Sequence, residues 1–175
     1  MLAAPMTPEH ARVMARYNRW MNDKLYAVAA KLTDAERKQD RAAFFRSIHG
    51  TFNHILVGDR VWLGRFTGAA LEEGAFGPGG IRALDQELYA DFDELRRERA
   101  RTDDEIDAYA ATLTADALAG DLRFLRRGVA NALPLWHAVA HFFNHQTHHR
   151  GQVTTLLVQA GHDPGSTDLV AMLRS

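Results

Sequence analysis

Histidines are concentrated in one stretch of the sequence, residues 137–152, which holds five of the nine in the chain. Four of them, His137, His141, His145 and His149, recur at every fourth position. On an α-helix, residues four apart lie one above the other on the same face. A neutral imidazole repeated at this spacing favours a metal site, because its nitrogen lone pair is a common ligand for transition metals.

The four histidines cannot all bind one ion. Each step of four residues rotates by roughly 40° around the helix, so His137 and His149 point about 120° apart. One adjacent pair is expected to share an ion, either His141 with His145 or His145 with His149, and the spacing leaves both pairs open. Burying two imidazoles without partners would cost about 1–3 kcal/mol each, which favours a bound ion over an empty pair.

A second expected helix, from after Asp40 to Phe66, has two polar exceptions to its apolar stripe, His54 and Asp59. His54 together with His145 and His149 would give three nitrogen ligands inside a bundle and leave further positions for water or substrate. That arrangement is an open metal site. The alternative is a metal-free core, because a histidine on an apolar face is more often a hydrogen-bonded core residue than a ligand.

Several other kinds of site are excluded by the residues present. The chain has no cysteine, so thiolate nucleophiles and cysteine-ligated metals are ruled out, and the ligands must be nitrogen or oxygen. The spacing His-x-x-x-His is that of zinc peptidases, but no glutamate lies between His141 and His145 or between His145 and His149. No nucleophile elbow or phosphate-binding glycine motif is present.

The periodicity of apolar residues predicts an all-α fold, a four-helix bundle formed by residues 1–175 as one domain. The long helices are expected at residues 7–31, 41–66, 81–113 and 134–160. The third of these is expected to place Leu84 inside and to kink or restart at Thr102, and the last to begin with Pro134 at its first position. Capping residues predict a short helical turn at Thr33, and weak alternation around Gly128 predicts a small hairpin before the last long helix.

Charge and hydropathy set limits on partners. The chain has 21 basic and 22 acidic residues and a formal charge of −1, which leaves no basic surface for nucleic acid or for an anionic membrane. Residues 1–10 lack the features of a secretion signal, and no apolar run reaches the roughly 20 residues of a membrane span. A cytoplasmic protein with a small-molecule substrate is expected.

Three blocks of sequence together resemble the DinB family of bacterial four-helix-bundle proteins: residues 17–22, residues 51–63 and, most specifically, residues 141–152. The resemblance implies that three histidines bind a divalent ion, commonly nickel or zinc. Those roles fall on His54, His145 and His149, which selects the second of the two pairs. His141, His148 and Gln152 then become residues of the surrounding pocket.

The wider family includes transferases and isomerases that use a low-molecular-weight thiol such as bacillithiol, mycothiol or glutathione. The resemblance therefore implies a metal-dependent thiol S-transferase or isomerase, or a hydrolase. An ion held by three neutral imidazoles would lower the pKa of a bound water or thiol. Asp59 is expected to orient a ligand imidazole through its free N–H. Asp59, His141 and Gln152 are also expected to support catalysis by the metal-bound water or thiol. The alternative is a non-catalytic, stress-related metal-binding bundle. A homodimer is expected in either case.

Overall fold

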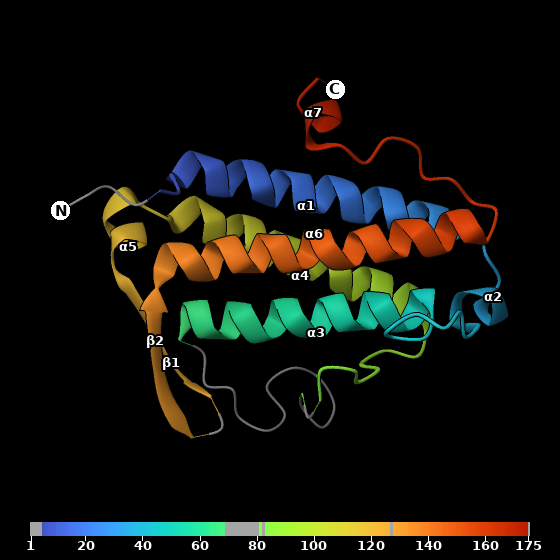
Figure 1. The fold of residues 1–175 in the computed structure, drawn as a ribbon, viewed down its shortest axis with the longest axis horizontal. Helices are drawn as coiled ribbons and strands as arrows, with labels where there is room; N and C mark the ends of the chain where they lie inside the picture. The colour runs from blue at the N-terminus through green and yellow to red at the C-terminus, as the bar shows by residue number, and fades with distance from the viewer. Residues whose placement is uncertain (1–4, 69–80, 82, 127, 175) are drawn as a thin grey trace.

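The computed structural model describes residues 5–68, 81, 83–126 and 128–174. Four long helices form a bundle (Figure 1): α1 (Pro8–Ala29), α3 (Ile48–Thr67), α4 (Phe92–Thr112) and α6 (Leu135–Gln159). Because α1 and α3 each pack against both α4 and α6, they lie diagonally across the bundle from each other. The predicted all-α four-helix bundle is confirmed.

The long helices form two pairs of opposite direction (Figure 1). α1 and α6 both run toward the end of the bundle where the short helix α2 (Asp34–Lys38) lies, whereas α3 and α4 run away from it. Two further short helices, α5 (Ala115–Ala119) and α7 (Leu169–Met172), flank α6 in sequence. The two helices that carry the candidate ligands, α3 and α6, are therefore antiparallel neighbours.

Several helix ends follow from their capping residues. The hydroxyl of Thr7 accepts a hydrogen bond from the backbone N–H of His10 at 3.1 Å, and Pro8 occupies the first turn of α1. Thr33 and Glu36 form the predicted reciprocal capping box of α2. Gly161, at φ 83°, ends α6 in the left-handed conformation that favours glycine.

Two helices begin later than predicted. α3 starts at Ile48 and not after Asp40, because Arg46 has a positive φ of 65° and Ser47 caps the helix by accepting the N–H of Gly50 at 2.9 Å. α4 starts at Phe92 and not at Ile81, after Asp91 as cap. Leu84, predicted to lie inside a helix, is 61% exposed in the segment before α4.

Two smaller predictions about helix boundaries are also wrong. α4 continues without a restart at Thr102, whose hydroxyl donates to the carbonyl of Glu98 at 2.8 Å within the helix. Asp103 is buried among polar side chains, so the apparent capping motif serves tertiary contacts. Pro134 precedes α6 as its cap and is the last residue of a strand, so the helix begins at Leu135.

The predicted hairpin is present before α6. Strands β1 (Asp121–Arg126) and β2 (Val129–Pro134) pair antiparallel, with Arg126 opposite Val129 and Gly128 at φ 75° in the turn. The hairpin lies at the end of the bundle where α3 stops and α6 starts (Figure 1). It therefore adds a strand surface next to α3, where the ring of Phe124 lies 6.1 Å from that of Trp62.

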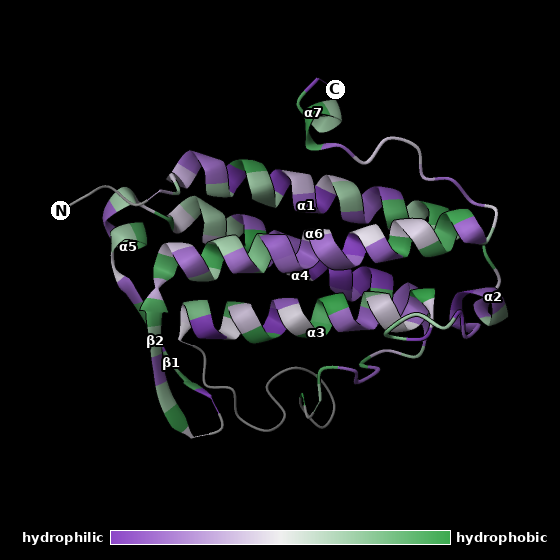
Figure 2. Ribbon diagram, viewed as in Figure 1, coloured by the Kyte–Doolittle hydropathy of each residue, from purple (hydrophilic) through white to green (hydrophobic). Residues whose placement is uncertain are grey.

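The bundle interior is divided along its length. Two apolar clusters, one around Phe52 and Leu95 and the other around Ile106 and Phe142, fill the two ends. Between them lie buried polar side chains: Asn18, Asn22, Asp59, Arg99, Asp103, Gln146 and Arg150. Figure 2 shows the matching hydrophilic middle of α6 between its more hydrophobic ends. In the described part of the chain, no helix is long and apolar enough to cross a membrane.

Candidate metal centre

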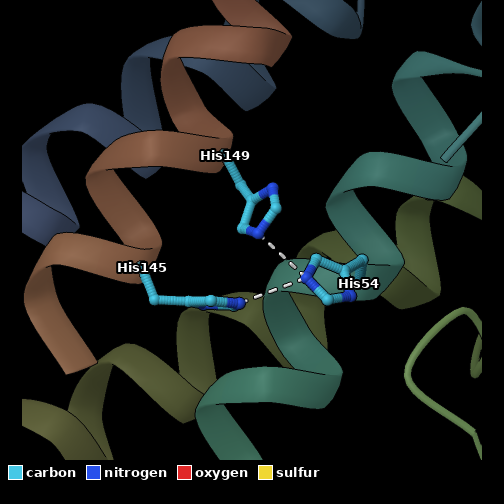
Figure 3. A group of neighbouring side chains, drawn as sticks. All are labelled: His54, His145 and His149. Atoms are coloured by element: carbon cyan, nitrogen blue, oxygen red, sulfur yellow. Dashed lines mark hydrogen bonds between the residues drawn. The ribbon is translucent and has the colours of Figure 1, made fainter. Parts of the chain in front are cut away.

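Three histidines from two helices meet between α3 and α6 (Figure 3). His54 of α3 has its Nε2 atom 3.2 Å from Nε2 of His145 and 3.1 Å from Nε2 of His149, both on α6. One nitrogen of each ring lies within 4.8 Å of those of the other two, an arrangement that could hold a metal ion. His54 and His149 are buried and His145 is half-buried.

The hydrogen bonds on the far side of two rings determine which nitrogen carries a proton. Nδ1 of His54 lies 2.6 Å from the backbone carbonyl of Leu84, which can only accept a hydrogen bond, so this Nδ1 donates. Nδ1 of His149 lies 2.8 Å from Oε1 of Gln152 and donates likewise. In their neutral forms both rings therefore direct an unprotonated Nε2 toward the space between the three histidines, as metal binding requires.

The neutral forms are favoured by the surroundings. Burial lowers the pKa of His54 and of His149. Burial, together with the neighbouring His149 and His54, lowers the pKa of His145 to about 3. The three rings therefore stay neutral at pH 7, and His54 and His149 point lone pairs at each other, an arrangement that a cation would stabilise.

The spacing of these nitrogens fits a small transition-metal ion. Two imidazole nitrogens at about 2.0–2.1 Å from an ion, and at about 90–110° to each other, lie about 2.9–3.4 Å apart. The separations of 3.1 and 3.2 Å from Nε2 of His54 fall within that range. Three neutral nitrogen ligands suit zinc, nickel, copper or iron.

Aromatic and apolar residues shape the entrance to the centre. Phe45 stacks on the ring of His54 at 3.7 Å between centroids and meets the ring of His149 edge-on. A cavity of about 590 Å³ opens onto the three histidines and is also lined by Phe44, Phe45, Leu84 and Asp85. A small molecule can therefore reach the point that the three nitrogens share.

Gly58, one turn after His54, makes room for His145. A Cβ atom at this position would lie only 2.7 Å from Cε1 of His145, closer than real Cβ contacts allow. The ring of His145 thus packs directly on the backbone of α3. A larger residue at position 58 would have to displace it.

The role predicted for Asp59 needs correction. Its carboxylate accepts hydrogen bonds from Nη1 of Arg99 at 2.5 Å and from Nε2 of Gln146 at 2.9 Å, not from a ligand imidazole. The reason is geometric: five residues after His54, Asp59 points about 140° away from it around α3. The hydrogen bonds from the ligand imidazoles that were expected to go to Asp59 go instead to the carbonyl of Leu84 and to the amide oxygen of Gln152.

The other predicted pocket residues lie at different distances from the centre. Gln152 contacts His149 directly, and its Nε2 lies 3.3 Å from Nε2 of the exposed His148. His141 is exposed, with its ring 6.0 Å from that of His145 and 5.1 Å from that of Trp62. His141 therefore lies beside the three histidines and not among them.

Sequence reasoning missed Phe45 and Leu84 as parts of this site. The periodicity of apolar residues predicts Phe45 and Leu84 inside long helices, but α3 and α4 start later, at Ile48 and Phe92. Ser47, followed by an apolar residue, was the available signal for the later start of α3. No local signal marks the carbonyl of Leu84, because it meets His54 across a separation of 30 residues.

Comparisons with known proteins agree with the fold. The crystal structure of a DinB-like protein from Bacillus cereus ATCC 10987 matches this chain with a TM-score of 0.57 and 21% sequence identity, covering 85% of this chain and 91% of that one. A search of the curated proteins gave no match. The sequence profile of the DinB family matches residues 6–175. The chain therefore belongs to the DinB family.

Proposed function

We propose that this protein binds a divalent metal ion, nickel or zinc, through Nε2 of His54, His145 and His149. The observation that carries the proposal is the direction of the protons: Leu84 and Gln152 hold them on Nδ1 of two rings. The Nε2 atoms of His54 and His149 are then both unprotonated and lie 3.1 Å apart with no proton between them, and Nε2 of His145 lies 3.2 Å from Nε2 of His54. Such a cluster is unfavourable without a cation.

We further propose that the bound ion serves a thiol S-transferase or isomerase reaction on a small molecule. When bound, the ion would act as a Lewis acid that lowers the pKa of a coordinated thiol. The chain contains no cysteine, so the thiol would come from outside. Phe44, Phe45 and Leu84 at the cavity would pack against apolar parts of the reactants and exclude water from them.

Metal analysis of protein purified without a histidine tag tests the first part. We expect about one divalent ion per chain in the wild type and loss of binding in the His145→Ala/His149→Ala double mutant. A wild type that takes up neither nickel nor zinc, or a double mutant that binds either as tightly, contradicts the site.

The second part requires an assay of thiol transfer. Low-molecular-weight thiols and electrophiles are screened with the wild type and with His54→Ala, which removes one nitrogen ligand. We expect transfer that the substitution reduces by at least about 100-fold. Transfer that is absent, or equal in both proteins, argues against catalysis at this centre.

The second candidate is a non-catalytic, metal-binding homodimer. It is favoured by the exposed apolar side chains of Val158 near the end of α6 and of Val170 and Leu173 around α7. Light scattering coupled to size exclusion measures the mass of the particle in solution. A metal-loaded dimer without thiol transfer supports this candidate, and a monomer contradicts it.

A further inference from the structure

A second cluster of side chains lies beside the metal centre, and the function proposed above does not use it. Trp62 and Arg65 come from α3, Phe124 from β1 and His141 from α6. We call these four residues the Arg65 patch. Three are half-buried and His141 is exposed, so the patch is accessible from solvent.

Two aromatic rings hold Arg65 in place. Its guanidinium carbon lies 4.5 Å from the ring centroid of Trp62 and 4.7 Å from that of Phe124. Both contacts are within the range of cation–π attraction. The long side chain therefore has a defined position before any ligand arrives, and little entropy remains to be lost on binding.

Among the residues that the structure describes, Arg65 nevertheless has no carboxylate as a counter-ion. Its Nε is buried without a hydrogen-bond partner. Burial lowers the pKa of its guanidinium, and the positive charge of Arg126 lowers that pKa further. By contrast, Arg60 on the same helix pairs with Glu98, and Arg99 on α4 pairs with Asp59.

The patch adjoins the metal centre along one side of α3. The ring of His141 lies between the two, 5.1 Å from Trp62 and 6.0 Å from His145. Gly58, which contacts His145, and Arg65 are separated by seven residues, about two helical turns or about 10 Å. One small molecule of moderate length could span both.

We infer that the Arg65 patch binds the carboxylate of the small-molecule thiol that the metal centre takes up. The terminal N–H groups of a guanidinium offer parallel donors that match the two oxygens of a carboxylate. A bound carboxylate would also supply the negative charge that the described residues do not give Arg65. The inference rests on the proposed function. It adds the substrate class: a thiol with a carboxylate about 10 Å from its sulfur.

The test uses cobalt-loaded protein and two probes that differ only in charge, mercaptooctanoate and mercaptooctanamide. Thiol binding to cobalt gives a near-ultraviolet charge-transfer band, from which the Kd of each probe is measured. We expect the wild type to bind the carboxylate about 10-fold tighter than the amide. In Arg65→Gln and Arg65→Met the two probes are expected to bind equally.

Arg97, exposed on α4, provides the matched control, because Arg97→Gln removes the same charge elsewhere. It should keep the preference for the carboxylate. Equal Kd values for the two probes on the wild type overturn the inference alone, as does a preference that survives in both Arg65 variants or disappears in Arg97→Gln. No cobalt band with either probe contradicts the proposed function, and the inference with it.

Discussion

At the scale of single residues, the candidate centre depends on atoms that are not ligands. The carbonyl of Leu84 and the amide oxygen of Gln152 each hold an Nδ1 proton, which leaves Nε2 of His54 and of His149 free for an ion. Leu84 does this with its backbone while its side chain stays exposed. Gly58 contributes by the absence of a side chain, since His145 occupies the space of a Cβ atom.

The substitution Gly58→Ala tests how closely His145 must approach α3. The added Cβ would force the ring to move, because its distance to Cε1 would be 2.7 Å. We expect metal affinity to fall by about 10-fold to 100-fold, as when a supporting group of a metal site is removed. Competition with a chelator of known affinity measures the change.

Gly151 on α6 is the matched control for this substitution. A Cβ there would meet nothing within 4 Å, so Gly151→Ala should leave metal affinity unchanged and raise stability by about 0.5–1 kcal/mol. Unchanged affinity in Gly58→Ala, or equal losses in both variants, would contradict the role given to Gly58.

At the scale of elements, the orientation of α6 is set by contacts on two of its faces. His145 and His149 each precede a buried polar residue, Gln146 and Arg150, which point about 100° away around the helix. Gln146 binds Asp59 of α3, and Arg150 donates a hydrogen bond to Asn18 of α1. These contacts limit rotation of α6 about its axis and so keep its histidines directed at His54.

Helix α4 completes this polar layer. Arg99 pairs with Asp59 at 2.5 Å and with Asp103 at 2.9 Å, and Asp103 accepts hydrogen bonds from Asn18 and Asn22 of α1. The layer contains two buried arginines and two buried aspartates, so its positive and negative charges are equal in number: Arg99, Arg150, Asp59 and Asp103. The layer therefore connects all four long helices at the level of the metal centre.

Asp59→Ala should be strongly destabilising, because it leaves Arg99 and Gln146 without their partner in a buried setting. Breaking a buried ion pair on one side costs about 3–5 kcal/mol. Urea denaturation of metal-free protein measures the change in the free energy of unfolding. Lys38→Ala, which removes the exposed pair with Asp34, should cost less than about 0.5 kcal/mol. A similar small loss for Asp59→Ala would show that the layer contributes little.

At the scale of the whole molecule, the described part of the bundle buries one further neutral histidine besides those of the centre. His49 is fully buried, and its Nε2 donates to the carbonyl of Tyr89 at 2.8 Å. Burial lowers its pKa in the folded chain. Below about pH 6.5 the unfolded chain therefore binds a proton at this position that the folded chain does not.

It follows that His49 contributes stability above about pH 6.5 that is lost as the pH falls. One proton corresponds to a slope of up to about 1.4 kcal/mol per pH unit. In His49→Gln, the dependence of unfolding free energy on pH should be shallower by about this amount between about pH 6.5 and pH 5. Urea titrations of both proteins with a chelator present measure it. Identical slopes would mean that His49 is protonated equally in both states.

The sequence by itself determined the features that depend on neighbours a few residues apart. The spacing of apolar residues gave the long helices, Thr7 and Thr33 gave the starts of α1 and α2, and Gly161 gave the end of α6. The recurrence of histidine at every fourth residue indicated that α6 carries the candidate metal ligands. It left two pairs open, and the likeness to the DinB family selected His145 with His149.

Only the tertiary structure decided what depends on residues far apart in the chain. Leu84 meets His54 over 30 positions, Gln146 meets Asp59 over 87, and Arg65 meets Phe124 across two elements. The periodicity of apolar residues predicts Leu84 and Phe45 inside helices. Periodicity shows which residues are apolar, but it does not show which distant segment of the chain packs against them. Leu84 and Phe45 line the cavity at the three histidines only because the folded chain brings the segments before α4 and α3 against His54.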